Sequence, residues 1–164
     1  MTLQNVILVI AATTTALVAG LFYAWTCSVT PGLARLSNTE YIRAMQSFNT
    51  YIQNPLFFAS FLGTALLLPF CSYVHFGQPV SMRFWMLIIS TIIYLTGVFG
   101  VTIFGNVPLN DSLAAFQLDT ATASEIADAR NKFENPWNSL NTIRTVASTI
   151  SIILVIIACI SRED

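Results

Sequence analysis

The segment Glu134-Asn-Pro-Trp-Asn-Ser-Leu-Asn-Thr-Ile-Arg144 opens the last long apolar run of this 164-residue chain and places an arginine inside it. Trp137 is typical of the membrane interface, where its amphipathic ring is favoured. Arg144 lies roughly 10 Å deeper, at a rise of about 1.5 Å per residue. Asn138, Asn141 and Arg144 recur at helical spacing, so one face of this helix is polar. An ionisable side chain at this depth faces a bundle interior or a wet cavity, which makes it a candidate for a functional site.

Four apolar runs are each long enough to cross a bilayer, which takes about 20 residues of helix. Of all residues, 55% are hydrophobic and only 9% are charged, against about 25% charged in soluble domains. The runs are 5–29, 55–74, 84–104 and 137–160, and Arg144 is the one full charge inside them. The sequence therefore predicts an all-α, multi-pass integral membrane protein. We expect one transmembrane domain over residues 1–164, a four-helix bundle surrounded by membrane lipid.

Short amphipathic helices are predicted between the runs. Ser37 with Glu40, and Thr122 with Glu125, each form the capping box that starts a helix. Asn110 is expected to cap a further short helix. The three helices are expected at about 38–53, 111–117 and 123–134. Such helices beside membrane segments commonly lie on the interface. We expect them to cap one face of the bundle, with the short link 75–82 and both termini on the other face.

The chain divides into two similar halves, a pseudo-repeat of residues 1–75 and 83–160. Each half consists of a span, a proline break, a capped amphipathic helix, an Asn-Pro pair and a second span. Pro31 and Pro108 are expected to end helices, because proline cannot continue the hydrogen-bond ladder. Asn54-Pro55 and Asn135-Pro136 are each expected to start a span, with asparagine as the N-cap. The two halves would share one orientation, as in other membrane folds with parallel repeats.

The first run carries a small residue at every fourth position. The positions are Ala12, Ala16, Gly20, Ala24 and Ser28. Small residues at this spacing let helix backbones approach closely in lipid. We expect them to pack inside the bundle, and the alternative is a face for a homo-oligomer.

Several classes of function lack the residues that they need. The net charge of −1 gives no electrostatic case for nucleic acid. His75 is the single histidine and lies in the short link, so a three-histidine zinc site, a copper site or a Ser-His-Asp set is not expected. No acidic residue lies within a run, which disfavours an ion-coupled transporter. The three cysteines lack a CxxC spacing and are interpreted as packing residues.

Arg144 has two interpretations on the residues alone. As a structural residue it would hold the cap against the bundle, through Asp111, Glu134 or a carbonyl released at a proline. As a functional residue it would hold an anion or an electron-rich oxygen at the mouth of a pocket. Asn138 and Asn141 favour a site, because helix capping and turn formation do not explain them. Further asparagines crowd the same face, among them Asn49, Asn106 and Asn110.

Two motifs resemble a known family. Gly105-Asn-Val-Pro-Leu-Asn110 is followed, after a short helical region, by Trp137-x-x-x-Asn141-x-x-Arg144. This pair is similar to a family of small four-span membrane proteins, long a domain of unknown function, that includes the fungal anthrone oxygenases. The earlier segment with Gly20, Pro31, Met45-Gln46, Asn49 and Asn54-Pro55 fits as well, so the resemblance covers nearly the whole chain.

The resemblance implies an oxidoreductase that converts an anthrone to an anthraquinone with dioxygen and no known cofactor. An anthrone is aromatic, apolar and acidic at one carbon, and it would suit an aromatic-lined pocket at the interface. A base would remove the carbon-bound proton, and a cation would stabilise the enolate. A binder of a small aromatic or quinone-like molecule, and a non-catalytic structural or accessory membrane protein, stay open as alternatives.

The same resemblance implies roles for individual residues. Arg144 is the expected stabiliser of the enolate, and Asn141 and Asn138 would position the oxygens. Glu134 or Asp111 is the expected base. The ring of Trp137 would stack on the substrate, and further substrate contacts are expected from Asn49, Asn106 and Asn110.

Overall fold

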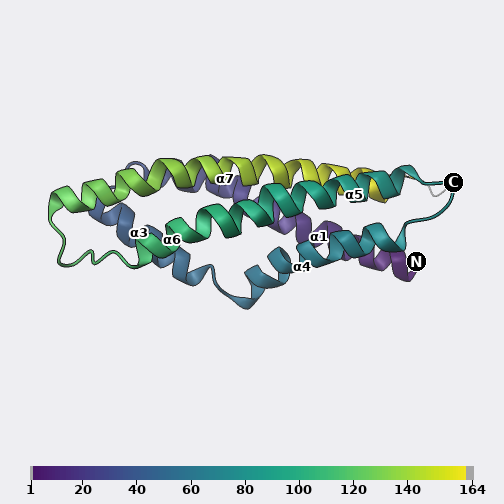
Figure 1. Ribbon diagram of the computed structural model, residues 1–164, viewed down its shortest axis with the longest axis horizontal. Helices are drawn as coiled ribbons and strands as arrows, with labels where there is room; N and C mark the ends of the chain where they lie inside the picture. The colour runs from purple at the N-terminus through teal and green to yellow at the C-terminus, as the bar shows by residue number, and fades with distance from the viewer. Residues whose placement is uncertain (1, 162–164) are drawn as a thin grey trace.

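Four long helices make up most of the molecule. The structure is a computed structural model and describes residues 2–161. Four helical spans are long and apolar enough to cross a membrane: Leu3–Leu33, Pro55–Val74, Met82–Ala114 and Ala123–Ile160. The N-terminus and the link before Met82 lie at one end of the molecule, and the opposite end carries the shorter helices (Figure 1). The predicted integral membrane protein with four spans is confirmed.

The described residues form helices and connecting turns. The elements are α1 (Leu3–Ala24), η1 (Trp25–Val29), α2 (Thr30–Leu33), α3 (Asn38–Tyr51), α4 (Pro55–Val74), α5 (Met82–Tyr94), η2 (Leu95–Gly100), η3 (Thr102–Asn106), α6 (Val107–Ala114) and α7 (Ala123–Ile160). The η segments are π-helices, whose turns are wider than those of an α-helix. α1 packs on α4 and α7, and α5 packs on α4 and α7, so the four spans form a closed bundle.

Pro31 and Pro108 do not end their helices, so that prediction is wrong. Each lies two residues after a π-helix, η1 or η3, and the helix continues through it. The residue before each proline donates its N–H to the carbonyl five residues earlier, from Thr30 to Trp25 and from Val107 to Thr102. Proline lacks an N–H, and its ring crowds the preceding turn. A wider turn at this point relieves the crowding and carries the span on into the cap.

The two Asn-Pro pairs have different roles. Asn54 is the N-cap of α4, and its side-chain oxygen accepts from the N–H groups of Leu56 and Phe57 at 3.0 and 3.1 Å. Asn135 and Pro136 lie inside α7, which runs without a break for 38 residues. The predicted boundary at Pro136 is therefore wrong, although the capping box that begins α7 at Thr122 is confirmed. Asn110 lies within α6 and caps no helix, which corrects that prediction as well.

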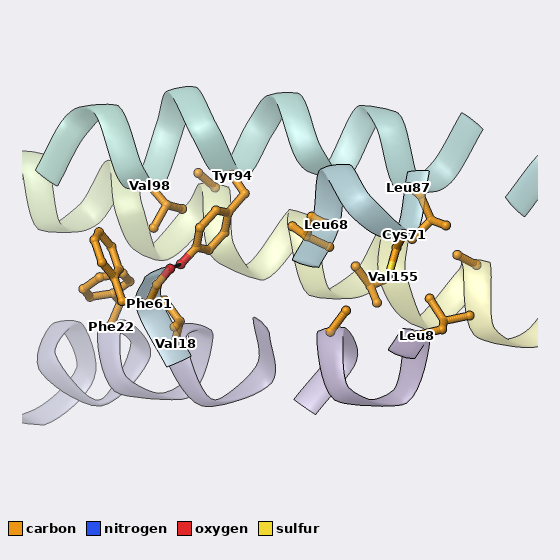
Figure 2. Packing of buried hydrophobic residues seen from close by; sticks show 13 residues of the cluster. Leu8, Val18, Phe22, Phe61, Leu68, Cys71, Leu87, Tyr94, Val98 and Val155 are labelled. Atoms are coloured by element: carbon orange, nitrogen blue, oxygen red, sulfur yellow. Dashed lines mark hydrogen bonds between the residues drawn. The ribbon is translucent and has the colours of Figure 1, made fainter. Parts of the chain in front are cut away.

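The core of the bundle combines apolar packing with hydrogen bonds between the spans. Figure 2 shows the Tyr94 hydroxyl pointing to α4, where it donates to the Phe61 carbonyl at 2.9 Å. Ser90 and Ser151 each donate to the other's carbonyl, which links α5 to α7. In lipid, such bonds satisfy polar groups that have no water to pair with.

Close helix packing occurs between α7 and the third span, not where the sequence predicted it. A Cβ added to Gly97 would lie 2.7 Å from the Cβ of Ala147, so only glycine fits there. On α1, by contrast, Ala16, Gly20 and Ala24 are exposed, and a Cβ at Gly20 would meet nothing within 4 Å. The prediction that this stripe packs inside the bundle is therefore wrong.

The different roles of the two Asn-Pro pairs can be tested by paired substitutions. Asn54→Ala removes an N-cap and should lower the free energy of unfolding by about 1 kcal/mol. Asn135→Ala, inside a helix and on its exposed side, should change it by less than about 0.5 kcal/mol. Unfolding in detergent micelles, followed by circular dichroism, measures both. Equal losses in the two variants would show that Asn135 caps a helix as Asn54 does.

Candidate functional site

A cavity of about 210 Å³ lies beside Arg144, at the end of the bundle that carries the shorter helices. All four spans and α3 contribute to its walls. Aromatic rings make up much of the lining: Phe22, Trp25, Phe48, Phe57, Phe58, Phe61 and Trp137. The polar lining is sparse and includes Asn49, Asn110, Asp111, Asn141 and Arg144. A largely apolar pocket with a few converging polar groups is the usual form of a small-molecule site.

Arg144 is 5% exposed and is held by neutral groups only. Its Nη2 donates to Asn141 Oδ1 at 2.9 Å, and its Nη1 donates to Thr102 Oγ1 at 3.4 Å. The guanidinium carbon lies 4.4 Å from the ring centre of Phe22 and 5.3 Å from that of Trp137, within range of a cation–π interaction. Nε has no hydrogen-bond partner among the described residues. The charge is therefore buried in a membrane span, and no carboxylate of residues 2–161 is paired with it.

A chain of hydrogen bonds fixes the orientation of Asn141. Its Nδ2 donates to Thr26 Oγ1 at 3.0 Å, and Thr26 Oγ1 lies 2.7 Å from Thr145 Oγ1. Thr145 also donates to the carbonyl of Phe22 at 3.1 Å. Because the amide nitrogen is held on the η1 side, the amide oxygen faces Arg144. The π-helix η1 thus supplies the hydroxyl that orients the one amide bound to the guanidinium.

Arg130 makes the kind of contacts that were expected of a structural Arg144. Arg130 donates to the carbonyls of Ala34 and Leu36, which follow α2, and forms an ion pair with Glu134 at 2.6 Å. Its guanidinium also lies 4.4 Å from the ring centre of Tyr41, and burial raises the pKa of that tyrosine. Arg130 therefore joins α7 to the loop and helix that follow the first span.

The structure brings together some of the predicted site residues and separates others. Arg144, Asn141, Trp137, Asn110 and Asn49 all line the cavity, and Trp137 Nε1 donates to Asn110 Oδ1 at 2.9 Å. Glu134 does not line it, since its carboxylate is held by Arg130. Asp111, the other predicted base, does line it.

Asn106 and Asn138 also lie outside the cavity lining. Asn106 is 1% exposed, and neither of its amide atoms has a partner among the described residues. Asn138 Oδ1 is likewise buried without a partner. Leaving a buried amide atom unpaired costs about 1–3 kcal/mol, so both side chains lie where a polar contact would be stabilising.

The electrostatics of the cavity favour an anion on the Arg144 side. A buried cation without a counter-ion is costly in a low-dielectric interior, and a ligand with negative charge offsets that cost. Arg144 and Asn49 both line the cavity, and each has a buried donor, Nε and Nδ2, without a hydrogen-bond partner among residues 2–161. Asp111 also lines the cavity and is exposed. The arrangement fits a flat apolar molecule that carries an oxygen able to hold negative charge.

Thr26, Thr102 and Phe22 are functional neighbours that sequence reasoning missed. A threonine or phenylalanine inside an apolar run is a common helix residue and gives no signal of its own. They meet Arg144 only because three spans converge on it.

Among residues 2–161, no three His, Cys, Asp or Glu side chains are grouped as metal ligands.

Comparison with known proteins gives one family. A family model described as anthrone oxygenase matches residues 55–154, which include α4, the third span and most of α7. No curated protein and no solved structure matches the chain.

The hydrogen-bond chain that orients Asn141 can be tested at Thr26. Thr26→Val keeps the shape of the side chain but leaves Asn141 Nδ2 without its hydrogen-bond partner, and should lower the free energy of unfolding by about 1–3 kcal/mol. The matched control is Thr13→Val, since Thr13 is exposed and bonds only to its own helix. That variant should change stability by less than about 0.5 kcal/mol in the same micelle assay. A Thr26→Val protein as stable as Thr13→Val would contradict the described network.

Proposed function

This chain belongs to the anthrone oxygenase family, and from that premise we propose that it oxidises a planar, oxygen-bearing aromatic molecule with dioxygen in the cavity beside Arg144. The observation that carries the proposal is the arginine cation itself. It is buried among aromatic rings, and within the described part of the chain it has no paired carboxylate and its Nε has no hydrogen-bond partner. Such a group is suited to stabilise negative charge that develops on a substrate oxygen.

The first step is removal of a proton from the CH₂ carbon of the substrate, which is conjugated with the carbonyl group through the aromatic rings. Asp111 lines the cavity on its exposed side and is the proposed base. The resulting enolate carries its charge on oxygen, which the guanidinium of Arg144 would stabilise with the amide of Asn49 beside it in the lining. Asn141 holds the guanidinium in place and is a positioning residue in this scheme.

The oxidation balances with dioxygen as the only oxidant. The enolate carbon gives electrons to dioxygen and forms a carbon–oxygen bond, which yields a hydroperoxide after proton uptake. Loss of water then leaves a carbonyl. Overall a CH₂ group becomes C=O, one oxygen atom enters the product, and the other leaves as water with the two hydrogens. The residues supply deprotonation, charge stabilisation and an apolar, aromatic enclosure.

Oxygen uptake with a panel of anthrones and hydroquinones tests the proposal. Arg144→Gln should lower kcat by about 10²–10³-fold, the usual loss when a donor to a developing oxyanion is removed. Asp111→Asn should also lower kcat, because an amide cannot accept the proton. Glu134→Gln is the matched carboxylate control and should retain the wild-type kcat, since Glu134 lies outside the cavity.

Two results would contradict the proposal. Wild-type protein that takes up no oxygen with any member of the panel, while binding its aromatic compounds, would make the chain a binding protein. An Arg144→Gln variant that fails to fold, with no uptake by the wild type, would give Arg144 a purely structural role.

A further inference from the structure

The exposed lining residues of the cavity include two pairs of different polarity. Phe58 of α4 and Ile103 of η3, here called the apolar rim, are 41% and 40% exposed. Gln53 and Asp111, here called the polar rim, are also exposed. The first rim is apolar on both edges, whereas the second is suited to water.

The apolar rim lies within two spans, close to one edge of the hydrocarbon layer. Phe58 is one turn inside α4, so a rise of about 1.5 Å per residue places it roughly 5 Å beyond the helix start. Ile103 lies roughly 30 Å along the third span from Met82, about one hydrocarbon thickness. Both residues belong to spans, and their exposed apolar side chains therefore face acyl chains. Figure 1 shows the turn before α4 at the edge of the molecule, at the start of the helix that carries Phe58.

We infer that the ligand enters and leaves the cavity from the lipid phase, between Phe58 and Ile103, while its proton leaves through the Asp111 rim to water. This inference rests on the proposed function and assigns the substrate to lipid-dissolved aromatics. A neutral aromatic molecule partitions into lipid, and its anion does not. Deprotonation inside the cavity would therefore trap the molecule as an anion beside Arg144. Oxidation to a neutral product would release it back to the lipid.

The test uses the protein's own tryptophans in vesicles. The chain has three tryptophans, and two of them, Trp25 and Trp137, line the cavity. In a Trp85→Phe background, all tryptophan fluorescence therefore reports on the cavity. Anthraquinone is the neutral lipid-soluble probe, and anthraquinone-2-sulfonate is its water-soluble counterpart. Stopped-flow quenching gives the association rate of each, and brominated phospholipids report on acyl-chain contact without any ligand.

Paired variants change the width of the apolar rim. Ile103→Phe should narrow it and slow anthraquinone association several-fold, while Ile92→Phe, on an exposed position of α5 outside the cavity, should not. Phe58→Ala should speed association and raise quenching by brominated lipid, while Leu56→Ala, on the neighbouring exposed position of α4, should change neither.

Doubling the lipid at fixed total anthraquinone should roughly halve the association rate, because the probe is diluted in the membrane.

The results separate the access route from the proposed function. Association rates of anthraquinone that are unchanged in Ile103→Phe and Phe58→Ala, and that follow the aqueous concentration, would overturn the lipid route. So would rapid binding of the sulfonate at the wild-type anthraquinone rate. Loss of oxygen uptake in Arg144→Gln would support the proposed function whether or not the ligand enters from the lipid. A wild-type protein whose cavity tryptophans are quenched by neither anthraquinone nor brominated lipid would overturn the access route outright.

Discussion

A cation buried in a membrane span, with no carboxylate paired to it in the part of the chain that the structure describes, is the constraint on which the rest of the site depends. Arg144 is offset only by an amide oxygen, a hydroxyl and two aromatic rings. Such groups stabilise the charge in part, and a full anion would stabilise it further. The more conventional task of an arginine, binding free carbonyls and a carboxylate, is carried out by Arg130 at the cap. Arg144, by contrast, has no carboxylate partner among residues 2–161.

The π-helices make the site possible. η1 and η3 each precede a proline and allow the first and third spans to continue past the point where an α-helix would be broken. Thr26 lies in η1 and Thr102 in η3, and both bond to the Asn141–Arg144 pair. π-helical turns are often found at functional sites. Here the same turns let the helix continue through a proline and place a threonine beside the Asn141–Arg144 pair.

Much of the fold follows from the sequence, and the parts that do not have identifiable causes. Hydropathy predicts the four spans. Local side-chain chemistry predicts the N-cap at Asn54 and the two capping boxes. Helix continuity through Pro31, Pro108 and Pro136 was missed, because a neighbouring π turn or tertiary packing overrides the local preference of proline. At the site, the charge and its spacing identified Arg144, Asn141 and Trp137. The pairing of Glu134 with Arg130, and the aromatic lining, depend on contacts between distant segments. The pseudo-repeat stays a prediction, now with the π-helix and proline pair as its common feature.

The central claim is that Arg144 binds an anionic aromatic oxygen. It is tested most directly by spectral titration of 1,8-dihydroxyanthrone bound to the protein in vesicles under nitrogen, where the enolate and neutral forms absorb at different wavelengths. A cation beside the oxygen favours the anion, so the account predicts that the pKa of the bound anthrone falls below its value in protein-free vesicles. The Arg144→Gln variant should bring that pKa back to the protein-free value. An unchanged pKa in the wild-type protein, or an equal decrease in Arg144→Gln, would contradict the account.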